Sequence, residues 1–123
     1  MRFKEYNIAV VGVSLNKKKY GYKIFKDLKN NGYKVYGINP EINEFEDGVK
    51  IYENLSKLPV KPDIVITVVQ PEVSENIIDE CIKLGIKYVW LQPGSESHAA
   101  IEKAHKNNIK TTTACFMVHN GLW

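Results

Sequence analysis

Residues 8–21 of this chain combine a short uncharged run, a glycine, a polar loop and a second glycine that opens a helical pattern. The run from Ile8 to Val11 is followed by Gly12, and the helical pattern begins around Gly21. This order predicts a strand, a tight turn and a helix start, where backbone N–H groups and the positive end of the helix dipole face one point. The stretch differs from both Gly-x-Gly-x-x-Gly and the P-loop pattern. It therefore predicts a phosphate site outside those two classes.

Apolar strands alternate with amphipathic helices along the whole chain. Strands are predicted at residues 7–13, 34–38, 63–69, 87–91 and 110–114, and helices at 20–31, 71–84 and 95–108. The stretch 39–53 looks irregular, with room for a short extended piece at 49–52, and one helical turn follows at 53–58. This alternation predicts an α/β fold that is Rossmann-like and doubly wound, with a mainly parallel five-stranded sheet and helices on both faces. Numbering the five strands along the chain, we expect the sheet order 3-2-1-4-5.

Length, charge and hydropathy limit the classes of partner. The 123 residues suit one domain spanning positions 1–123. No apolar run approaches the roughly 18 residues of a membrane span, and the charged start at residues 1–5 lacks a signal region, so we expect a cytoplasmic protein. The net charge is +3, and the lysines are spread out except at 17–19, so no nucleic-acid partner is predicted. The two cysteines match no metal spacing and are interpreted as free thiols.

Three predicted strands leave the sheet through an amide residue followed by proline. These pairs are Asn39-Pro40, Gln70-Pro71 and Gln92-Pro93. Proline stiffens each exit, and the carboxyl ends of parallel strands form the ligand crevice of such sheets. Amide side chains at this edge suit nucleobase edges, ribose hydroxyls or the amides of a pantetheine arm. For any one pair the alternative is that proline merely ends the strand, but the recurrence at one edge favours a ligand role.

The residue after the second predicted strand discriminates between nucleotides. Domains that hold NAD generally place Asp or Glu there, whereas this chain has Asn39, and the nearest acid, Glu41, lies beyond the proline. The loop also carries Lys17, Lys18 and Lys19, more cations than one pyrophosphate requires. For each lysine the alternative is a solvated surface charge. Together these residues indicate a ligand with more phosphate than NAD.

Five short segments, in this chain order, carry a resemblance to a known family: Gly12-Val13-Ser14, Lys19-Tyr20-Gly21, Ile38-Asn39-Pro40, Val89-Trp90-Leu91-Gln92 and Cys115-Phe116-Met117-Val118. From about residue 7 to residue 118 the chain resembles the small stand-alone CoA-binding domain family. That family is similar to the N-terminal CoA-binding domain of succinyl-CoA ligase α subunits and to the ligand domain of redox-sensing repressors. The chain departs from it at Gln70, where members often carry a basic residue, and at His119-Asn120-Gly121, where they often carry a Glu-His pair.

The resemblance implies that coenzyme A, or an acyl-CoA, is the ligand and assigns its contacts. Phosphates would lie on Gly12, Val13, Ser14, Lys17, Lys18, Lys19, Tyr20 and Gly21. The adenosine and pantetheine path would be lined by Asn39, Pro40, Val69, Gln70, Pro71 and Gln92.

No catalytic or metal-binding set emerges from the sequence. Ser14 has no histidine placed to activate it and is interpreted as a donor to phosphate, while His98 and His105 share a predicted solvent-facing helix surface. Cys115 follows the fifth strand at the ligand edge, where its thiol could form a mixed disulfide with CoA; the alternative is that it packs as a small apolar residue. Cys81 and Trp90 are predicted to be core.

We therefore expect non-covalent CoA or short acyl-CoA binding by a module with a carrier, sensor or accessory role, without catalysis by this chain alone. The alternatives are a regulatory module that responds to NAD(H) or another nucleotide, and a non-catalytic subunit of an acyl-CoA ligase. A homo-oligomer and a ligase partner subunit are the protein partners left open.

Overall fold

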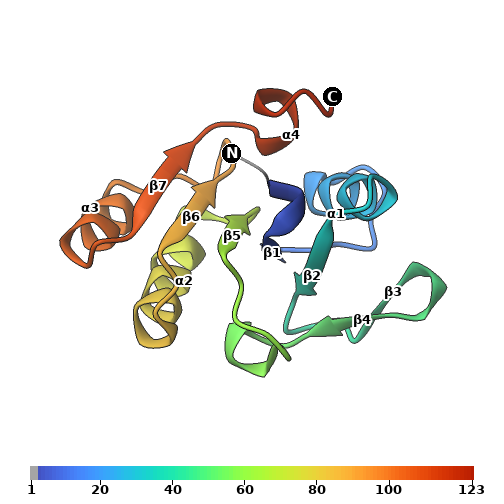
Figure 1. Ribbon diagram of the computed structural model, residues 1–123, viewed down its shortest axis with the longest axis horizontal. Coiled ribbons are helices and arrows are strands. Elements are labelled where there is room, and N and C mark those ends of the chain that lie inside the picture. The colour runs from blue at the N-terminus through green and yellow to red at the C-terminus, as the bar shows by residue number, and fades with distance from the viewer. Residues whose placement is uncertain (1–2) are drawn as a thin grey trace.

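The computed structural model describes residues 3–123, in which one sheet is covered by helices (Figure 1). The strands are β1 (Asn7–Val11), β2 (Lys34–Ile38), β3 (Glu44–Phe45), β4 (Val49–Tyr52), β5 (Ile64–Thr67), β6 (Tyr88–Leu91) and β7 (Lys110–Thr113). The α-helices are α1 (Tyr20–Asn30), α2 (Pro71–Leu84), α3 (His98–Lys106) and α4 (Phe116–His119). Short 3-10 helices are η1 (Phe3–Glu5), η2 (Glu46–Gly48) and η3 (Leu55–Lys57).

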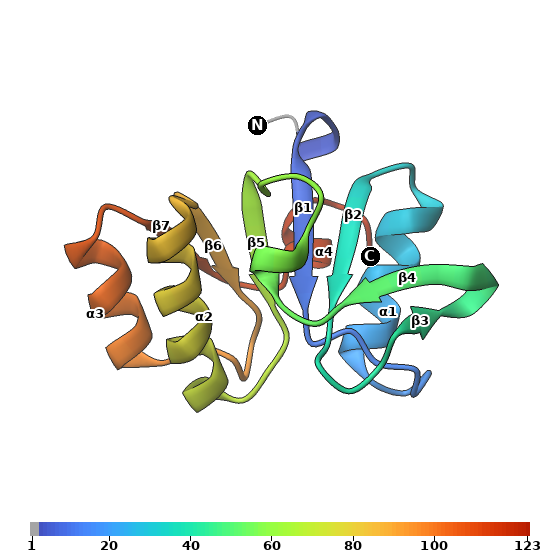
Figure 2. The ribbon, with the colours of Figure 1, turned by 90° about the horizontal axis from the view of Figure 1, so that it is seen from below.

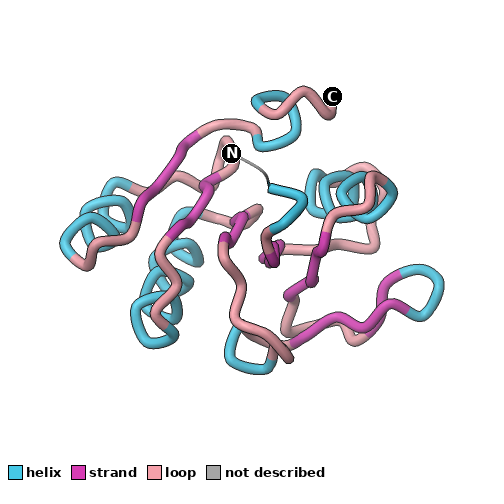
Figure 3. The backbone as a smooth tube through the Cα atoms, viewed as in Figure 1, coloured by secondary structure: helices cyan, strands magenta, loops and turns pink. Residues whose placement is uncertain are grey.

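The sheet has seven strands in the order β3-β4-β2-β1-β5-β6-β7. All neighbouring strands run parallel except β3 and β4, which form an antiparallel hairpin. The prediction of a mainly parallel α/β sheet with helices on both faces is confirmed, whereas the prediction of five strands is wrong. The two additional strands come from the stretch 39–53, which looked irregular; the extended piece at 49–52 is β4. Figure 3 shows η2 as the cyan turn that joins the two magenta strands of this hairpin.

The predicted strand order 3-2-1-4-5 is also wrong, because it placed the strand at 63–69 on the edge beside β2. That strand is β5, and it pairs with β1 and β6 in the middle of the sheet. All four residues of β5 are buried, and an apolar strand of this kind needs cover on both faces. The position beside β2 belongs to β4, whose alternating burial suits a strand near the sheet edge.

The helices divide between the two faces of the sheet. Figure 2 shows α2 and α3 in front of the strands and α1 and α4 behind them. The α1 face is rich in aromatic rings, including Phe25, Trp90 and Phe116, while the α2 and α3 face is mainly aliphatic. Cys81 lies in the aliphatic cluster and Trp90 in the aromatic one, so both core predictions are confirmed.

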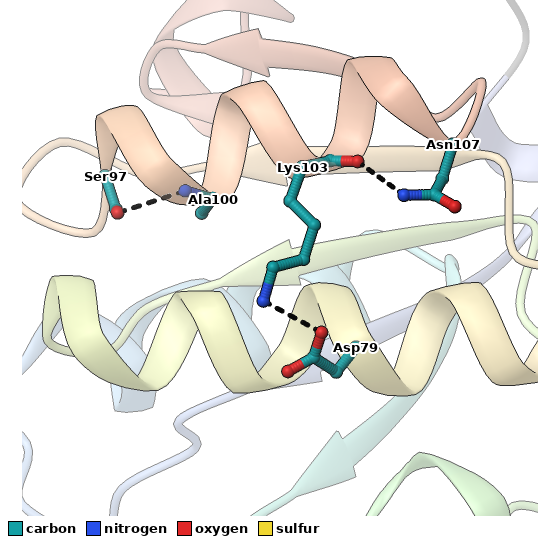
Figure 4. A network of polar contacts seen from close by, with 5 residues as sticks. All are labelled: Asp79, Ser97, Ala100, Lys103 and Asn107. Atoms are coloured by element: carbon teal, nitrogen blue, oxygen red, sulfur yellow. Dashed lines mark hydrogen bonds and ion pairs between the residues drawn. The ribbon is translucent and has the colours of Figure 1, made fainter.

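Local capping sets the helix boundaries on the α2 and α3 face. The helix predicted at 95–108 is shorter because Ser97 is its N-cap, with the hydroxyl oxygen accepting from the Ala100 N–H (3.2 Å). An ion pair between Lys103 and Asp79 (2.9 Å) joins α3 to α2 (Figure 4). Helix α2 ends at Gly85 in the left-handed conformation (φ 72°), as its sequence predicted.

The register of the parallel strands brings their carboxyl ends to one level. Val11 lies opposite both Ile38 and Thr67, Thr67 opposite Leu91, and Leu91 opposite Thr113. The loops after β1, β2, β5, β6 and β7 therefore leave the sheet along a single edge, where open α/β sheets bind ligands. Within residues 3–123, no helix is long and apolar enough to cross a membrane.

Candidate functional site

The two glycines of the loop after β1 allow it to lie in close contact with the end of β5 and the start of α1. Gly12 has φ +103°, and a Cβ at this position would collide with the carbonyl oxygen of Val68. A Cβ on Gly21 would collide with the carbonyl oxygen of Gly12. Both positions therefore require glycine for close backbone approach. The sequence predicted a glycine turn and a helix start here, and phosphate binding at this loop stays a prediction. The two glycines thus hold the loop close to the end of β5 and to the start of α1.

The start of α1 leaves backbone donors available beside this loop. Lys19 is the N-cap residue, it provides no side-chain cap, and the first turn of α1 contains no acidic residue. An uncapped helix N-terminus offers N–H groups and a positive dipole end to an anion. Lys17, Lys18 and Lys19 are all exposed at this point.

Asn16 organises the loop, although its role had no signal in the sequence. Its carbonyl oxygen accepts from the Lys19 N–H (3.0 Å), and its side-chain oxygen accepts from the Lys18 N–H (3.0 Å). Its own N–H donates to the hydroxyl oxygen of Ser14 (3.0 Å). Because Ser14 accepts in this bond, its hydroxyl proton remains free to donate to a phosphate.

Asn39 fixes the glycine loop to the end of β2. Its side-chain amide donates to the carbonyl oxygen of Val13 (2.7 Å), and its side-chain oxygen accepts from the Glu41 N–H (2.8 Å). The backbone carbonyl of Ile38 also accepts from the Gly12 N–H (3.0 Å). Asn39 thus has a structural role in shaping the site, and its predicted contact with a ligand, like that of the exposed Pro40 beside it, stays a prediction.

The exit from β5 is held by a serine that sequence reasoning missed. The buried hydroxyl of Ser95 donates to the Val69 carbonyl oxygen (2.6 Å) and accepts from the Val69 N–H (2.8 Å). This pair of bonds ties the β5 exit to the loop after β6. Gln70 is exposed and caps α2 through its backbone alone, and Pro71 is the first residue of that helix. Their predicted ligand contacts remain predictions.

Gln92 and Trp90 hold the segment that follows β7. The Gln92 side chain is only 3% exposed, and its Oε1 accepts from the Phe116 N–H (2.6 Å). The Trp90 indole N–H donates to the carbonyl oxygen of Ala114 (2.6 Å). These two side chains of β6 and its exit therefore set the position of residues 114–116.

A cleft of about 560 Å³ opens between α1 and this segment. It is lined by Tyr20, Tyr22, Lys23, Lys26, Asp27, Val68, Gln92, Pro93, Cys115, Val118 and Trp123. Of the ligand contacts that the family resemblance implied, Tyr20 and Gln92 line it, and so do Pro93 and Cys115, which the sequence placed at the ligand edge. The glycine loop lies at the start of α1, next to Tyr20. The other α1 residues repeat at helical spacing and could have been found from that pattern. Val118 and Trp123 carried no such signal.

Two of the charged residues that line the cleft, Lys26 and Asp27, have hydrogen-bond partners in the structure. Glu46 of η2 accepts hydrogen bonds from the Tyr22 hydroxyl (2.7 Å) and the Lys26 ammonium (2.6 Å). These bonds, first from Lys26 and then from Tyr22, lower the pKa of Glu46, and the bond to Glu46 raises the pKa of Tyr22 and of Lys26. The Trp123 indole N–H donates to Asp27 (2.7 Å).

The two cysteines differ in surroundings and are expected to differ in reactivity. Cys81 is fully buried in α2, and desolvation raises the pKa of its thiol to about 12. Cys115 is half-buried and lines the cleft. Because the thiolate is the nucleophile, we expect a thiol reagent such as Ellman's reagent to label Cys115 in the native protein and Cys81 only after unfolding.

Absorbance at equal protein concentration before and after denaturant measures this difference. Cys115→Ser should remove the native labelling and leave one thiol after unfolding. Rapid native labelling of that variant would contradict the expected protection of Cys81.

Within residues 3–123, no cluster of His, Cys, Asp and Glu could hold a metal ion. His98 and His105 are exposed on α3, as predicted. His98 lies 3.8 Å from Glu102, and the His105 ring is hydrogen-bonded to Thr111 (3.0 Å).

A family model and two curated relatives match this chain. A family model described as a CoA binding domain matches residues 6–121. The chain is 39% identical over 119 residues to the ADP-forming acetate–CoA ligase II subunit alpha of Pyrococcus furiosus, covering 88% of this chain and 26% of that one. It is 35% identical over 81 residues to the ADP-forming acetate–CoA ligase of Methanocaldococcus jannaschii, covering 66% of this chain and 11% of that one.

Two solved structures also resemble this chain in fold and sequence. A hypothetical protein from Pyrococcus horikoshii OT3 superposes with a TM-score of 0.89 at 31% identity, covering 98% of this chain and 84% of that one. The apo dinucleotide-forming acetyl-coenzyme A synthetase 1 of Ca. Korarchaeum cryptofilum gives 0.75 at 31% identity, covering 89% of this chain and 26% of that one. The chain thus spans about a quarter of the length of these ligase relatives or less.

Proposed function

Because this chain belongs to the CoA-binding domain family, we propose that it binds coenzyme A or a short acyl-CoA non-covalently at the carboxyl edge of its sheet. The pyrophosphate lies on the loop of residues 12–21, and the pantetheine arm runs past Tyr20 into the cleft between α1 and α4. The domain has a carrier, sensor or accessory role, and no bond is made or broken by this chain alone.

The glycine loop is the observation that carries this proposal. Gly12 and Gly21 allow a close backbone approach, the start of α1 has no cap or acid, and three exposed lysines surround it. A loop and helix N-terminus of this kind favour a phosphate group on both geometric and electrostatic grounds. The lysines supply charge for a further phosphate, such as the one that CoA carries on its ribose.

The cleft between α1 and α4 supports the proposed position of the pantetheine arm. Its volume falls in the range of small-molecule sites, and its walls include the apolar side chains of Val68, Val118 and Trp123. Gln92 supplies one polar side chain to the lining, and its Oε1 is the atom that Phe116 uses. The pantetheine arm, which is uncharged and carries amide groups, suits such a surface.

NAD is the weaker candidate ligand. The end of β2 presents Asn39, whose side chain is already bonded to Val13 and Glu41, in place of a carboxylate for the ribose hydroxyl. Glu41 lies beyond the proline and is exposed. This arrangement does not provide the acidic contact that NAD-binding domains use.

The likeness to ligase subunits supports a second candidate role. Since the chain matches about a quarter of the Pyrococcus furiosus alpha subunit, it could supply the CoA-binding part of an acyl-CoA ligase whose other parts are on partner chains. Co-purification of a ligase activity with the tagged protein, dependent on added CoA, tests that role.

Calorimetric titration with CoA, 3′-dephospho-CoA and NAD tests the ligand. We expect CoA to bind and to raise the thermal midpoint by mass action, with 3′-dephospho-CoA about tenfold weaker. At least one of Lys17→Ala, Lys18→Ala and Lys19→Ala should abolish this preference. Lys34→Ala, which removes an exposed lysine at the start of β2, is the matched control and should preserve it. Stabilisation by NAD without any response to CoA would contradict the proposal.

A further inference from the structure

Two of the three charged side chains on the α1 wall of the cleft, Lys26 and Asp27, already have hydrogen-bond partners. Lys26 points toward the cleft but is bonded to Glu46, and the two side chains are 33% and 32% exposed. The Tyr22 hydroxyl, also on this wall, donates to the same carboxylate. Asp27, the acidic group of the lining, accepts from the Trp123 indole. Both donors that could receive an anion midway along α1 are therefore engaged by Glu46.

A carboxylate entering this cleft would be poorly accommodated. Burying an ionised group among apolar side chains costs free energy unless a partner replaces its water. Lys26 and Tyr22 are engaged, and Asp27 would repel a second anion. Lys23 is the remaining cation of the lining; it is exposed, and its ammonium lies over the Tyr20 ring (5.7 Å) at the start of the helix.

From this arrangement we propose that the cleft selects acyl-CoA ligands whose acyl group is uncharged, and that Glu46 is the residue that sets this selectivity by occupying Lys26 and Tyr22. The inference rests on the proposed CoA-binding function and adds the class of acyl group to it. Glu46 lies on η2, between β3 and β4, and acts on the ligand through the two α1 side chains that it holds. It is a positioning residue, since it does not line the cleft.

Acetoacetyl-CoA and malonyl-CoA make a suitable pair of probes, because they differ chiefly in a methyl group against a carboxylate oxygen. Calorimetric titration should show the wild-type protein binding acetoacetyl-CoA about tenfold more tightly than malonyl-CoA. In Glu46→Gln the Tyr22 bond can persist, while Lys26 loses its counter-charge and becomes free to pair with the malonyl carboxylate. We expect the preference to fall to about unity in that variant.

Two further variants separate this local effect from a general change of charge. Glu44→Gln alters the net charge identically on the neighbouring exposed residue of β3 and should leave the tenfold preference in place. Adding Lys26→Gln to Glu46→Gln should restore discrimination against malonyl-CoA. The ratio of the two affinities is the readout, because a change in fold stability or phosphate attraction would alter both together.

The outcomes also separate this inference from the function on which it rests. Equal affinities in the wild type, or a Glu44→Gln effect as large as that of Glu46→Gln, would overturn the selectivity while leaving CoA binding intact. A protein that binds neither acyl-CoA nor CoA overturns both.

Discussion

Gly12→Ala is expected to lower the free energy of unfolding by about 3 kcal/mol or more and to abolish CoA binding. The substitution forces an alanine into φ +103° and directs its methyl group into the carbonyl oxygen of Val68. The clash is with backbone, which no side-chain rotation relieves. The loop must therefore move away from β5, and this displaces the backbone that is proposed to bind the pyrophosphate. Urea unfolding and CoA calorimetry measure the two effects.

Gly32→Ala is the matched control for this experiment. Gly32 also has a positive φ, +80°, but nothing lies within 4 Å of the position of its Cβ, and it follows α1 at the opposite end of that helix. We expect it to cost about 1 kcal/mol and to leave CoA binding unchanged. Equal losses of stability in the two variants would show that close approach to Val68 contributes nothing.

Trp90→Ala is expected to destabilise the fold by about 3–5 kcal/mol. Trp90 is 2% exposed on β6 and packs edge-on against the rings of Phe3 (6.0 Å between centroids) and Phe116 (4.9 Å). Its removal leaves a large cavity in the aromatic core and frees the Ala114 carbonyl, which accepts from the indole N–H. A domain of this size has a total stability of about 5–15 kcal/mol, so the loss is a large share of it.

Trp90→Phe separates packing from hydrogen bonding. The phenyl ring keeps much of the contact with its neighbours but leaves the Ala114 carbonyl without its indole donor, at a cost of about 1–3 kcal/mol. Because Ala114 precedes Cys115 in the cleft wall, CoA affinity should also fall in this variant. Wild-type stability for Trp90→Ala in equilibrium unfolding would be incompatible with the role given to Trp90.

The sequence predicted where most of the helices and strands lie along the chain, but it did not predict which strands lie side by side. Hydrophobic periodicity and terminal glycines located α1, α2 and the strands β1, β2, β5, β6 and β7, because burial and capping leave local patterns. The place of β5 beside β1 left no such pattern, since strand order depends on contacts distant in sequence. The hairpin of β3 and β4 was obscured by its short strands and by Asp47, whose positive φ (60°) forms part of the turn.

Some residues of the candidate site could likewise be predicted from the sequence, whereas others could not. The Gly12 and Gly21 positions could be predicted because close backbone approach restricts the residue type. Ser95 and Asn16 could not, because a polar residue in a loop has no periodic pattern and its partner is decided by folding. The same holds for the bond between Trp123 and Asp27, whose residues are 96 positions apart. Long-range contacts of this kind must be seen in the structure.

The path of residues 115–123 has a consequence for the order of events during synthesis. After β7, at the far edge of the sheet, the chain turns back to reach α1, whose residues leave the ribosome much earlier (Figure 1). Folding during translation begins with the N-terminal part, and contacts across a long stretch of chain form late. A nascent chain that ends at β7 therefore has the loop of residues 12–21 but lacks the part of the cleft wall formed by Cys115, Val118 and Trp123. The cleft reaches its final shape only when residues 115–123 have been synthesised. Under the proposed function, phosphate contact at residues 12–21 does not require these residues, whereas enclosure of the pantetheine arm does.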